Sequence, residues 1–192
     1  DGLIMLSDAD IERMITYYNN HAIDFSIIKF VPASGAASRK FQNLFNFLDD
    51  QKGNVSLTDL MNTDKSFNSV YTFISEIREF AFYNDLHNTL HQKGFNLENS
   101  INQGEFHQVI DLLLKEKGLR YVNLHKGVLK FHKYPETNSI AFEEHIVEAA
   151  NYGRSGNHVA NIHFTVSPEH LSRFQEEVNK VLKAYEIQFG IK

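Results

Sequence analysis

The spacing of apolar residues along the chain predicts an order of helices and strands. Ser7 precedes two aspartates as at a helix start, and apolar residues then recur at helical spacing, which predicts an amphipathic helix over residues 8–20. Residues 27–31 form a short β-branched apolar run that Pro32 ends, and this predicts a buried strand. A segment of small residues, 33–38, comes directly after it. Helical spacing then resumes, so the start of the chain predicts helix, strand, small-residue turn and helix.

The middle third of the chain has the spacing of helices alone. It predicts one long helix over about 64–91 and a second over about 106–113. After Gly118 the pattern changes, and short strands are predicted at 128–132 and 159–166, with a helix near 140–152 between them. The last predicted helix has Ser167 as its N-cap and Pro168 at its first position.

This order predicts an α/β fold. Strands that alternate with helices favour parallel pairing with right-handed crossovers. We therefore expect a Rossmann-like, mostly parallel partial sheet with an N-terminal helix and a helical insertion. Residues 1–25 are the helical lead-in, and 26–192 are the α/β domain with the insertion at about 50–118. If the strands at 27–31 and 128–132 are neighbours, the residues that come after them meet at one edge of the sheet.

Composition limits the class of protein further. The chain has 192 residues, of which 42% are hydrophobic, so it can bury a core as one domain. Its net charge of −5 argues against a surface built throughout to hold nucleic acid. It has no cysteine, which excludes disulfides, thiolate metal sites and a cysteine nucleophile. No apolar run is long enough to span a bilayer and no secretory signal is present, so we expect a soluble, cytoplasmic protein.

The small-residue segment between the first strand and its helix is the strongest candidate for chemistry. It consists of Ala33, Ser34, Gly35, Ala36, Ala37 and Ser38, and Arg39 comes next. Small residues let the backbone approach a ligand, and the N–H groups at a helix start attract an anion such as phosphate. The alternative is a tight turn whose small residues only pack a helix on a strand. The segment has neither the Walker ending nor the G-x-G-x-x-G spacing.

Four segments of the chain resemble known families. Residues 33–39 are similar to the A-G-G-x-G-T-R loop of sugar nucleotidyltransferases, and 126–129 are similar to their P-K-x-L segment. Residues 140–150 resemble the helix after P-K-x-L, and 164–170 resemble the next strand and helix start. The closer resemblance, over most of 8–190, is to a bacterial family of nucleotidyltransferase-like proteins, domain of unknown function forty-three-oh-one.

The resemblance implies roles for particular residues. Residues 33–38 would hold the base and triphosphate of a nucleoside triphosphate or nucleotide sugar, and Arg39 and Lys126 would bind phosphate as the catalytic cations. The sequence departs from the general pattern at three positions: Ser34 and Ala37 replace glycines, and His125 replaces the proline before the lysine. If active, the protein would be a transferase that joins a sugar phosphate to a nucleoside triphosphate.

Such enzymes use Mg²⁺, which needs carboxylate ligands. The last aspartate of the chain is Asp111, inside the predicted insertion, so the carboxylate that would hold Mg²⁺ is not evident and no metal ligand is assigned. We therefore interpret the chain as an N-terminal part of a larger protein or a natural short form, incomplete for catalysis. A part separated from its other half would expose apolar surface and self-associate.

Several other residues are weaker candidates. Glu144 and His145 are predicted to position the residues that contact the ligand without contacting it themselves. Carboxylates at a helix start, however, are commonly structural. The basic segment 115–133 is either a solvated face or an edge that faces phosphate or RNA. His87 and His91 have zinc-site spacing but lack the glutamate of H-E-x-x-H, so ordinary surface histidines are the better interpretation.

The sequence supports three functional hypotheses. The first is a nucleotidyltransferase-like domain that binds a nucleoside triphosphate or nucleotide sugar. The second is a non-catalytic domain that keeps the fold and binds a protein partner through its helical insertion. The third and weakest is an RNA-binding module that uses residues 115–133.

Overall fold

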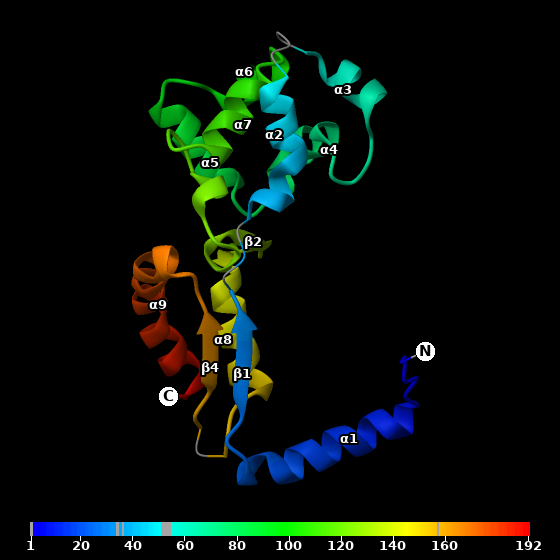
Figure 1. The fold of residues 1–192 in the computed structure, drawn as a ribbon, viewed down its shortest axis with the longest axis vertical. Coiled ribbons are helices and arrows are strands. Elements are labelled where there is room, and N and C mark those ends of the chain that lie inside the picture. The colour runs from blue at the N-terminus through cyan, green and yellow to red at the C-terminus, as the bar shows by residue number, and fades with distance from the viewer. Residues whose placement is uncertain (1, 34, 36, 51–54, 157) are drawn as a thin grey trace. The chain divides into compact units, whose positions relative to one another are not determined.

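The computed structural model describes residues 2–33, 35, 37–50, 55–156 and 158–192. The chain is mixed helix and strand, with a small parallel sheet and an N-terminal helix, so the predicted α/β class is confirmed. It divides into two compact units (Figure 1). The first unit contains residues 1–32, 143–166 and 171–192, and the second contains 33–142 and 167–170. The predicted lead-in and insertion boundaries stay predictions.

The first unit is built on two parallel strands. Its elements are α1 (Asp8–His21), η1 (Ala22–Asp24), β1 (Ile28–Pro32), most of α8 (Ala141–Tyr152), β4 (Asn161–Thr165) and most of α9 (Pro168–Phe189). Strand β1 pairs with β4 in register from Ile28 opposite Asn161 to Pro32 opposite Thr165. The sequence suggested a different neighbour for β1, the strand near 128–132, and that arrangement is wrong.

The second unit is mainly helical. Its elements are η2 (Ser38–Phe41), α2 (Gln42–Asp49), α3 (Leu57–Thr63), α4 (Val70–Ser75), η3 (Ile77–Glu79), α5 (Tyr83–Gln92), α6 (Leu97–Asn102), α7 (Phe106–Leu114), η4 (Tyr121–Asn123), η5 (Lys126–Val128), β2 (Lys130–Lys133) and β3 (Asn138–Ile140). Helix α7 lies at its centre, and Phe106, Val109, Ile110, Leu113 and Leu114 are fully buried on it. Burial on all sides explains why its apolar spacing is so dense.

The strand predicted at 128–132 is β2, and its partner is β3, which the sequence analysis missed. The two strands are antiparallel. Only residues 134–137 connect them, whereas a parallel crossover needs about a dozen residues. The short connection, which includes Pro135, therefore decides the antiparallel direction.

The long helix predicted over 64–91 is divided into α4, η3 and α5. Ser69 caps the start of α4, where its side chain accepts a hydrogen bond from the Thr72 N–H at 3.1 Å. The chain turns again at Glu76 and Phe80, whose backbones leave the α-helical region. The apolar residues kept helical spacing across these breaks because each short helix packs on the same core.

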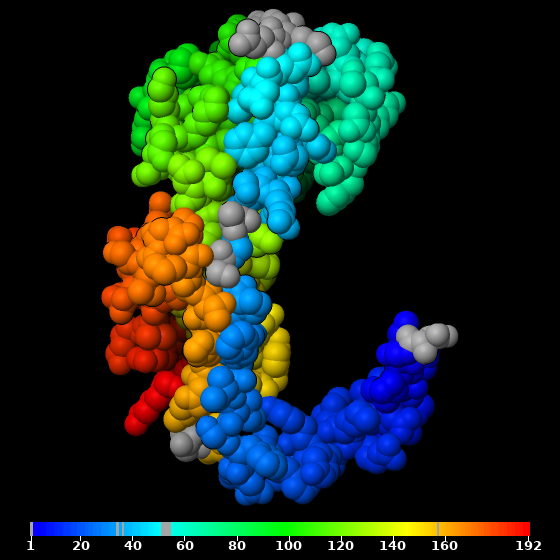
Figure 2. Space-filling model, in the orientation of Figure 1, coloured from blue at the N-terminus to red at the C-terminus, as the bar shows by residue number. Residues whose placement is uncertain are grey.

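The helix predicted over 8–20 is confirmed as α1, which begins with a capping box. Ser7 accepts from the Asp10 N–H at 3.2 Å, and the Asp10 carboxylate accepts from the Ser7 N–H. None of the α1 residues is buried, and Figure 2 shows this segment in dark blue with its side chains open. The helix forms from its local signals, and its apolar stripe stays unburied, although the Tyr18 hydroxyl donates a hydrogen bond to the Tyr152 carbonyl.

The β1–β4 sheet is covered on one face. Lys29 of β1 pairs with Glu148 of α8, and Phe164 of β4 contacts Phe174 of α9 at a ring distance of 5.1 Å. Both helices therefore pack on the face that contains the buried Val31. The opposite face is open: Ile28 and Phe30 each keep 64% of their surface exposed. The prediction of a fully buried strand is therefore wrong for this face.

Besides the open face of its sheet, the first unit exposes apolar residues of its N-terminal segment. Thirteen large apolar residues between Leu3 and Phe30 are exposed. Together they offer on the order of 1,000 Å² of apolar area, above the roughly 800 Å² per partner of a stable interface. We expect the chain to self-associate in a concentration-dependent way, and Phe30→Ser to weaken this association. Sedimentation velocity at increasing concentration measures it.

Phe95→Ser serves as the control, because Phe95 is an exposed aromatic residue of the second unit. It should leave the association unchanged. A clean monomer at the highest concentration would contradict the expectation.

The turn after α7 requires a glycine. A Cβ at Gly118 would overlap the backbone carbonyl of Leu112, which accepts a hydrogen bond from Leu119 N–H at 2.8 Å. Because backbone must move to admit a methyl group, Gly118→Ala should lower the free energy of unfolding by about 1–3 kcal/mol. Urea denaturation measures the loss, and Lys117→Ala at the neighbouring exposed position should change stability by under about 0.5 kcal/mol. Equal changes in the free energy of unfolding for Gly118→Ala and Lys117→Ala would show that the turn rearranges at no cost.

Candidate functional site

The segment after β1 is a loop in which Ala33 and Ala37 pack inside the second unit. Ala33 and Ala37 are buried, and Ala37 is fully covered. At these two positions packing explains the small residue, as the alternative interpretation of the sequence proposed. Ser34 and Ala36, which the sequence analysis assigned to the same nucleotide-binding loop, lie outside the described residues.

Gly35 differs from these alanines because packing does not require it. The atoms nearest to a Cβ on Gly35 would be those at the end of the Lys126 side chain, at 3.6 Å, which is ordinary van der Waals distance. The residue is exposed, and its φ is not among the positive values of the chain. Close approach of a ligand to the backbone is a physical reason for a glycine that packing and conformation leave unexplained.

The loop is joined directly to the segment that contains Lys126. The Lys126 N–H donates a hydrogen bond to the Gly35 carbonyl at 3.2 Å. On either side of Lys126, His125 and Gly127 are buried, whereas the lysine itself is exposed. The backbone is thus fixed by its buried neighbours, and the lysine is the member of the segment that reaches solvent. The structure brings these two predicted site residues together without the strand pairing that the sequence suggested.

Ser38, Arg39 and Lys40 form the 3₁₀ turn that leads into α2. The turn closes with a hydrogen bond from the Lys40 N–H to the Ala37 carbonyl at 2.9 Å, and the buried Phe41 anchors it. Ser38 is half-buried and Arg39 is exposed. In the described parts of the chain, neither Arg39 nor Lys126 has an ion pair.

Lys40 is a further cation at this site, which the sequence analysis did not assign. Its Nζ lies 4.0 Å from the centroid of the Phe131 ring, a cation–π distance. Partial burial lowers the Lys40 pKa, and the nearby positive charge of Lys126 lowers it further. We call four residues of this region the cationic loop site: Gly35, Arg39, Lys40 and Lys126.

A third segment from the sequence analysis also meets this site. Ser167–His170, which comes after β4, belongs to the second unit, and the His170 ring lies 5.5 Å from the ring of His125. His125 directly precedes Lys126. The segments at 33–39, 126–129 and 167–170 are far apart in sequence, yet the described residues of all three are gathered in one unit.

A cavity of about 210 Å³ lies beside Lys40, within the second unit. Its lining is mainly aromatic and apolar, with a few polar residues: Lys40, Phe41, Leu44, Phe67, Asn68, Ser69, Thr72, Phe73, Glu76, Phe80 and Phe82. We call it the phenylalanine pocket. The sequence analysis missed it because part of its wall comes from helices that it had merged into one and the rest from η2 and α2, which are distant in sequence.

Glu144 and His145 belong to the first unit, unlike the cationic loop site. The Nδ1 atom of His145 lies 3.2 Å from the Glu148 carboxylate, which also pairs with Lys29 of β1. His145 thus has a hydrogen-bond partner in the residue one turn later on the same helix. The supporting role of Glu144 and His145 stays a prediction.

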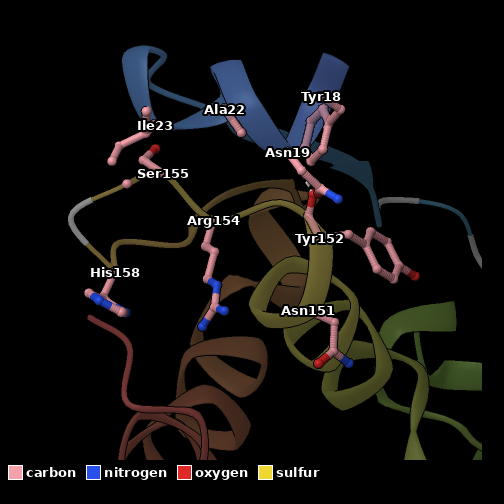
Figure 3. Close-up of a pocket in the computed structure, with 10 residues that line it drawn as sticks. Tyr18, Asn19, Ala22, Ile23, Asn151, Tyr152, Arg154, Ser155 and His158 are labelled. Carbon is pink, nitrogen blue, oxygen red and sulfur yellow. Dashed lines mark hydrogen bonds between the residues drawn. The ribbon is translucent and has the colours of Figure 1, made fainter. Parts of the chain in front are cut away.

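The first unit has a separate hollow of about 270 Å³ between η1 and the loop after α8 (Figure 3). Tyr18, Asn151, Arg154 and His158 are among the residues that line it. Figure 3 labels both Arg154 and His158 on that loop. None of the sequence-predicted site residues lines this hollow, so we do not take it as the main site.

The basic segment 115–133 is largely neutralised by local ion pairs. Its pairs with nearby acids are Lys115–Asp111, Arg120–Glu116, Lys130–Asp85 and Lys133–Glu79. Exposed pairs of this kind are typical of a solvated face. Lys117 and Lys126 have no such pair in the described structure.

The residues at the cationic loop site do not fit a magnesium ion. Mg²⁺ takes oxygen ligands, chiefly carboxylates, whereas the charged group that acts on Lys40 is another cation, Lys126. In the described ranges, no three His, Asp or Glu side chains gather as a metal site would need. We therefore assign no role to Mg²⁺ at this site. No helix in the described part of the chain is long and apolar enough to cross a membrane.

Comparison with known proteins decides the family. The sequence profile of one family, Domain of unknown function (DUF4301), matches residues 1–192. The chain belongs to this family. The resemblance that the motifs suggested is therefore confirmed at the level of the family. Members of DUF4301 have no function in their description, and neither a curated protein nor a solved structure matches the chain.

Proposed function

We propose that this domain binds the phosphate groups of a nucleoside triphosphate or nucleotide sugar at the cationic loop site. The observation that supports it most is the junction of Gly35 with Lys126, where a loop glycine meets an exposed lysine that has no ion pair within the described residues. Arg39 and Lys40 add two further positive charges from the adjacent turn. Phosphate is the common biological anion that such a loop and its cations recognise.

The chemistry at this site is binding and charge neutralisation. Lys126 would contact phosphate as a point charge, and Arg39 could offer two parallel N–H groups to one phosphate. The backbone at Gly35 would let the phosphate lie close to the chain. We propose a nucleotidyltransferase-like role in the cytoplasm in which this site binds the phosphates. Groups outside this site would carry out the transfer chemistry.

Removal of either cation should weaken phosphate binding. A charge-assisted hydrogen bond contributes about 1.5–3 kcal/mol, so Arg39→Ala and Lys126→Ala should each weaken tripolyphosphate binding about tenfold or more. The hydrogen bond from Lys126 to Gly35 involves the backbone and persists in Lys126→Ala. Isothermal titration calorimetry measures the affinity.

Lys117→Ala is the matched control, because Lys117 is an exposed lysine of the same unit outside the site. It should leave the affinity unchanged. No binding of tripolyphosphate or any nucleotide by the unsubstituted chain would contradict the proposal and favour the protein-interaction hypothesis.

The lowered pKa of Lys40 predicts a pH dependence. Because its pKa lies below that of an ordinary lysine, Lys40 loses its charge at a lower pH than other lysines do, and anion binding should weaken as pH rises. We expect tripolyphosphate affinity to begin to fall at a pH below the range in which ordinary lysines lose their charge. Lys40→Arg should flatten this fall, because arginine stays charged throughout. An identical pH profile in both proteins would show that Lys40 does not face the anion.

A further inference from the structure

The phenylalanine pocket beside Lys40 has the walls of a site for a flat ring. Phe80 stacks on Phe82 with centroids 5.1 Å apart and planes 12° from parallel, and Phe73 packs against Phe80 at 5.4 Å. Phe73 and Phe82 are buried and fixed, so the walls are formed before any ligand arrives. At about 210 Å³ the cavity is smaller than the roughly 300–1,000 Å³ of sites for whole drug-sized ligands. It has room for one ring system.

Phe67 lines this pocket yet keeps 93% of its surface exposed. An exposed phenylalanine adds nothing to the core, because its apolar area stays in water. It lies between α3 and α4, on the segment that precedes the capped start of α4. An aromatic ring held open at the edge of an aromatic cavity is placed to stack on a planar ligand.

The polar groups of the pocket are engaged with the protein, with one exception. Ser69 donates to Thr72 at 3.1 Å, and Thr72 donates to the Ser66 carbonyl at 2.9 Å. The Asn68 carbonyl accepts from the Asn43 side chain at 2.9 Å. In the described structure the Glu76 carboxylate has neither a hydrogen bond nor an ion pair. A carboxylate only accepts hydrogen bonds, so a ligand that pairs with Glu76 must present N–H or O–H donors.

We propose that the phenylalanine pocket binds the base of the nucleotide whose phosphates lie at the cationic loop site, and that this base is guanine. Lys40 lines the pocket and is also electrostatically coupled to Lys126, so a base in the pocket has its phosphates directed to the cations. The inference rests on the proposed phosphate site, and its chemistry is separate: stacking on Phe67 and pairing with Glu76.

Guanine fits the free carboxylate better than the other bases do. Its N1–H and its 2-amino group are adjacent donors on one edge, and the two oxygens of Glu76 can accept both at once. Adenine and cytosine each place a ring acceptor beside their amino group, which would repel the carboxylate. Uracil has one N–H between two carbonyl oxygens. An unmet donor or acceptor in such a pairing lowers affinity strongly, so the pocket should select among bases.

Titration of the full chain with GTP, ITP, ATP and tripolyphosphate tests this inference. GTP should bind tightest, with an affinity about tenfold or more above that of ATP. ITP should bind less tightly than GTP because it lacks the 2-amino group. Glu76→Gln should abolish the preference for GTP while tripolyphosphate binding is kept, because the amide turns one acceptor into a donor. Phe67→Ala should weaken every nucleoside triphosphate about fivefold or more and leave tripolyphosphate unchanged.

Both substitutions are at exposed positions, so folding is preserved. Glu79→Gln and Phe95→Ala are the matched controls: each residue is exposed, lies in the same unit and does not line the pocket. Neither should change the order of affinities.

The outcomes separate the two proposals. Equal affinity for GTP, ATP and tripolyphosphate would overturn the base pocket and leave the phosphate site standing. A base preference that survives Glu76→Gln would also overturn it. Guanosine that binds without its phosphates, loses affinity in Glu76→Gln and is unaffected by Lys126→Ala would support the pocket, even if tripolyphosphate fails to bind and the phosphate site falls. No binding of any of these ligands would overturn both.

Discussion

The hydrogen bond from the Lys126 N–H to the Gly35 carbonyl is the interaction on which the candidate site depends. One such bond contributes only about 0.5–1.5 kcal/mol, too little to fix two segments by itself. Its effect comes from its surroundings, because Ala37 is buried on one side and His125 and Gly127 on the other. Apolar burial holds both backbones in place, and the hydrogen bond sets how they meet.

The charge distribution around this junction is unusual for an acidic chain. Most basic residues between 115 and 133 have acidic partners, whereas Arg39 and Lys126 have none in the described structure, although the net charge is −5. Lys126 also lowers the pKa of Lys40, which shows that their charges repel. Repulsion of this kind opposes folding and is relieved when an anion binds. A site that keeps such repulsion has a physical reason to bind phosphate.

The first unit has a different imbalance, in which helices α8 and α9 cover one face of a two-stranded sheet and leave the other open. A sheet that is apolar on both faces normally has layers on both. Exposed Phe30 stacks on His163 of β4 at 4.9 Å, so the open face is ordered even without a covering layer. The apolar stripe of α1 is open in the same unit. Two uncovered apolar surfaces in one unit make association the expected behaviour.

Local patterns in the sequence were enough to place most of the helices and strands. The capping box at Ser7, the run ended by Pro32 and the start of α9 at Pro168 depend on neighbouring residues, and each was predicted correctly. The division of residues 64–91 was missed because helices that pack on one core share a spacing whether or not they are continuous. Motifs in the sequence identified the loop and Lys126 as candidates. The contact between them could not be predicted from those motifs.

Tertiary structure decided which strands and side chains are neighbours. Strand β1 pairs with β4 rather than β2, and β2 instead turns back through residues 134–137 onto β3. Lys40 became part of the site only because Phe131 and Lys126 lie next to it. Phe67 and Glu76 have no signal in the sequence, since an exposed phenylalanine and a glutamate without a partner are visible only once the surrounding helices are in place. The sequence by itself determined most of the elements and predicted a chemistry for the loop. The fold alone determined which distant side chains share a surface, because long-range packing, unlike a cap or a turn, leaves no local pattern.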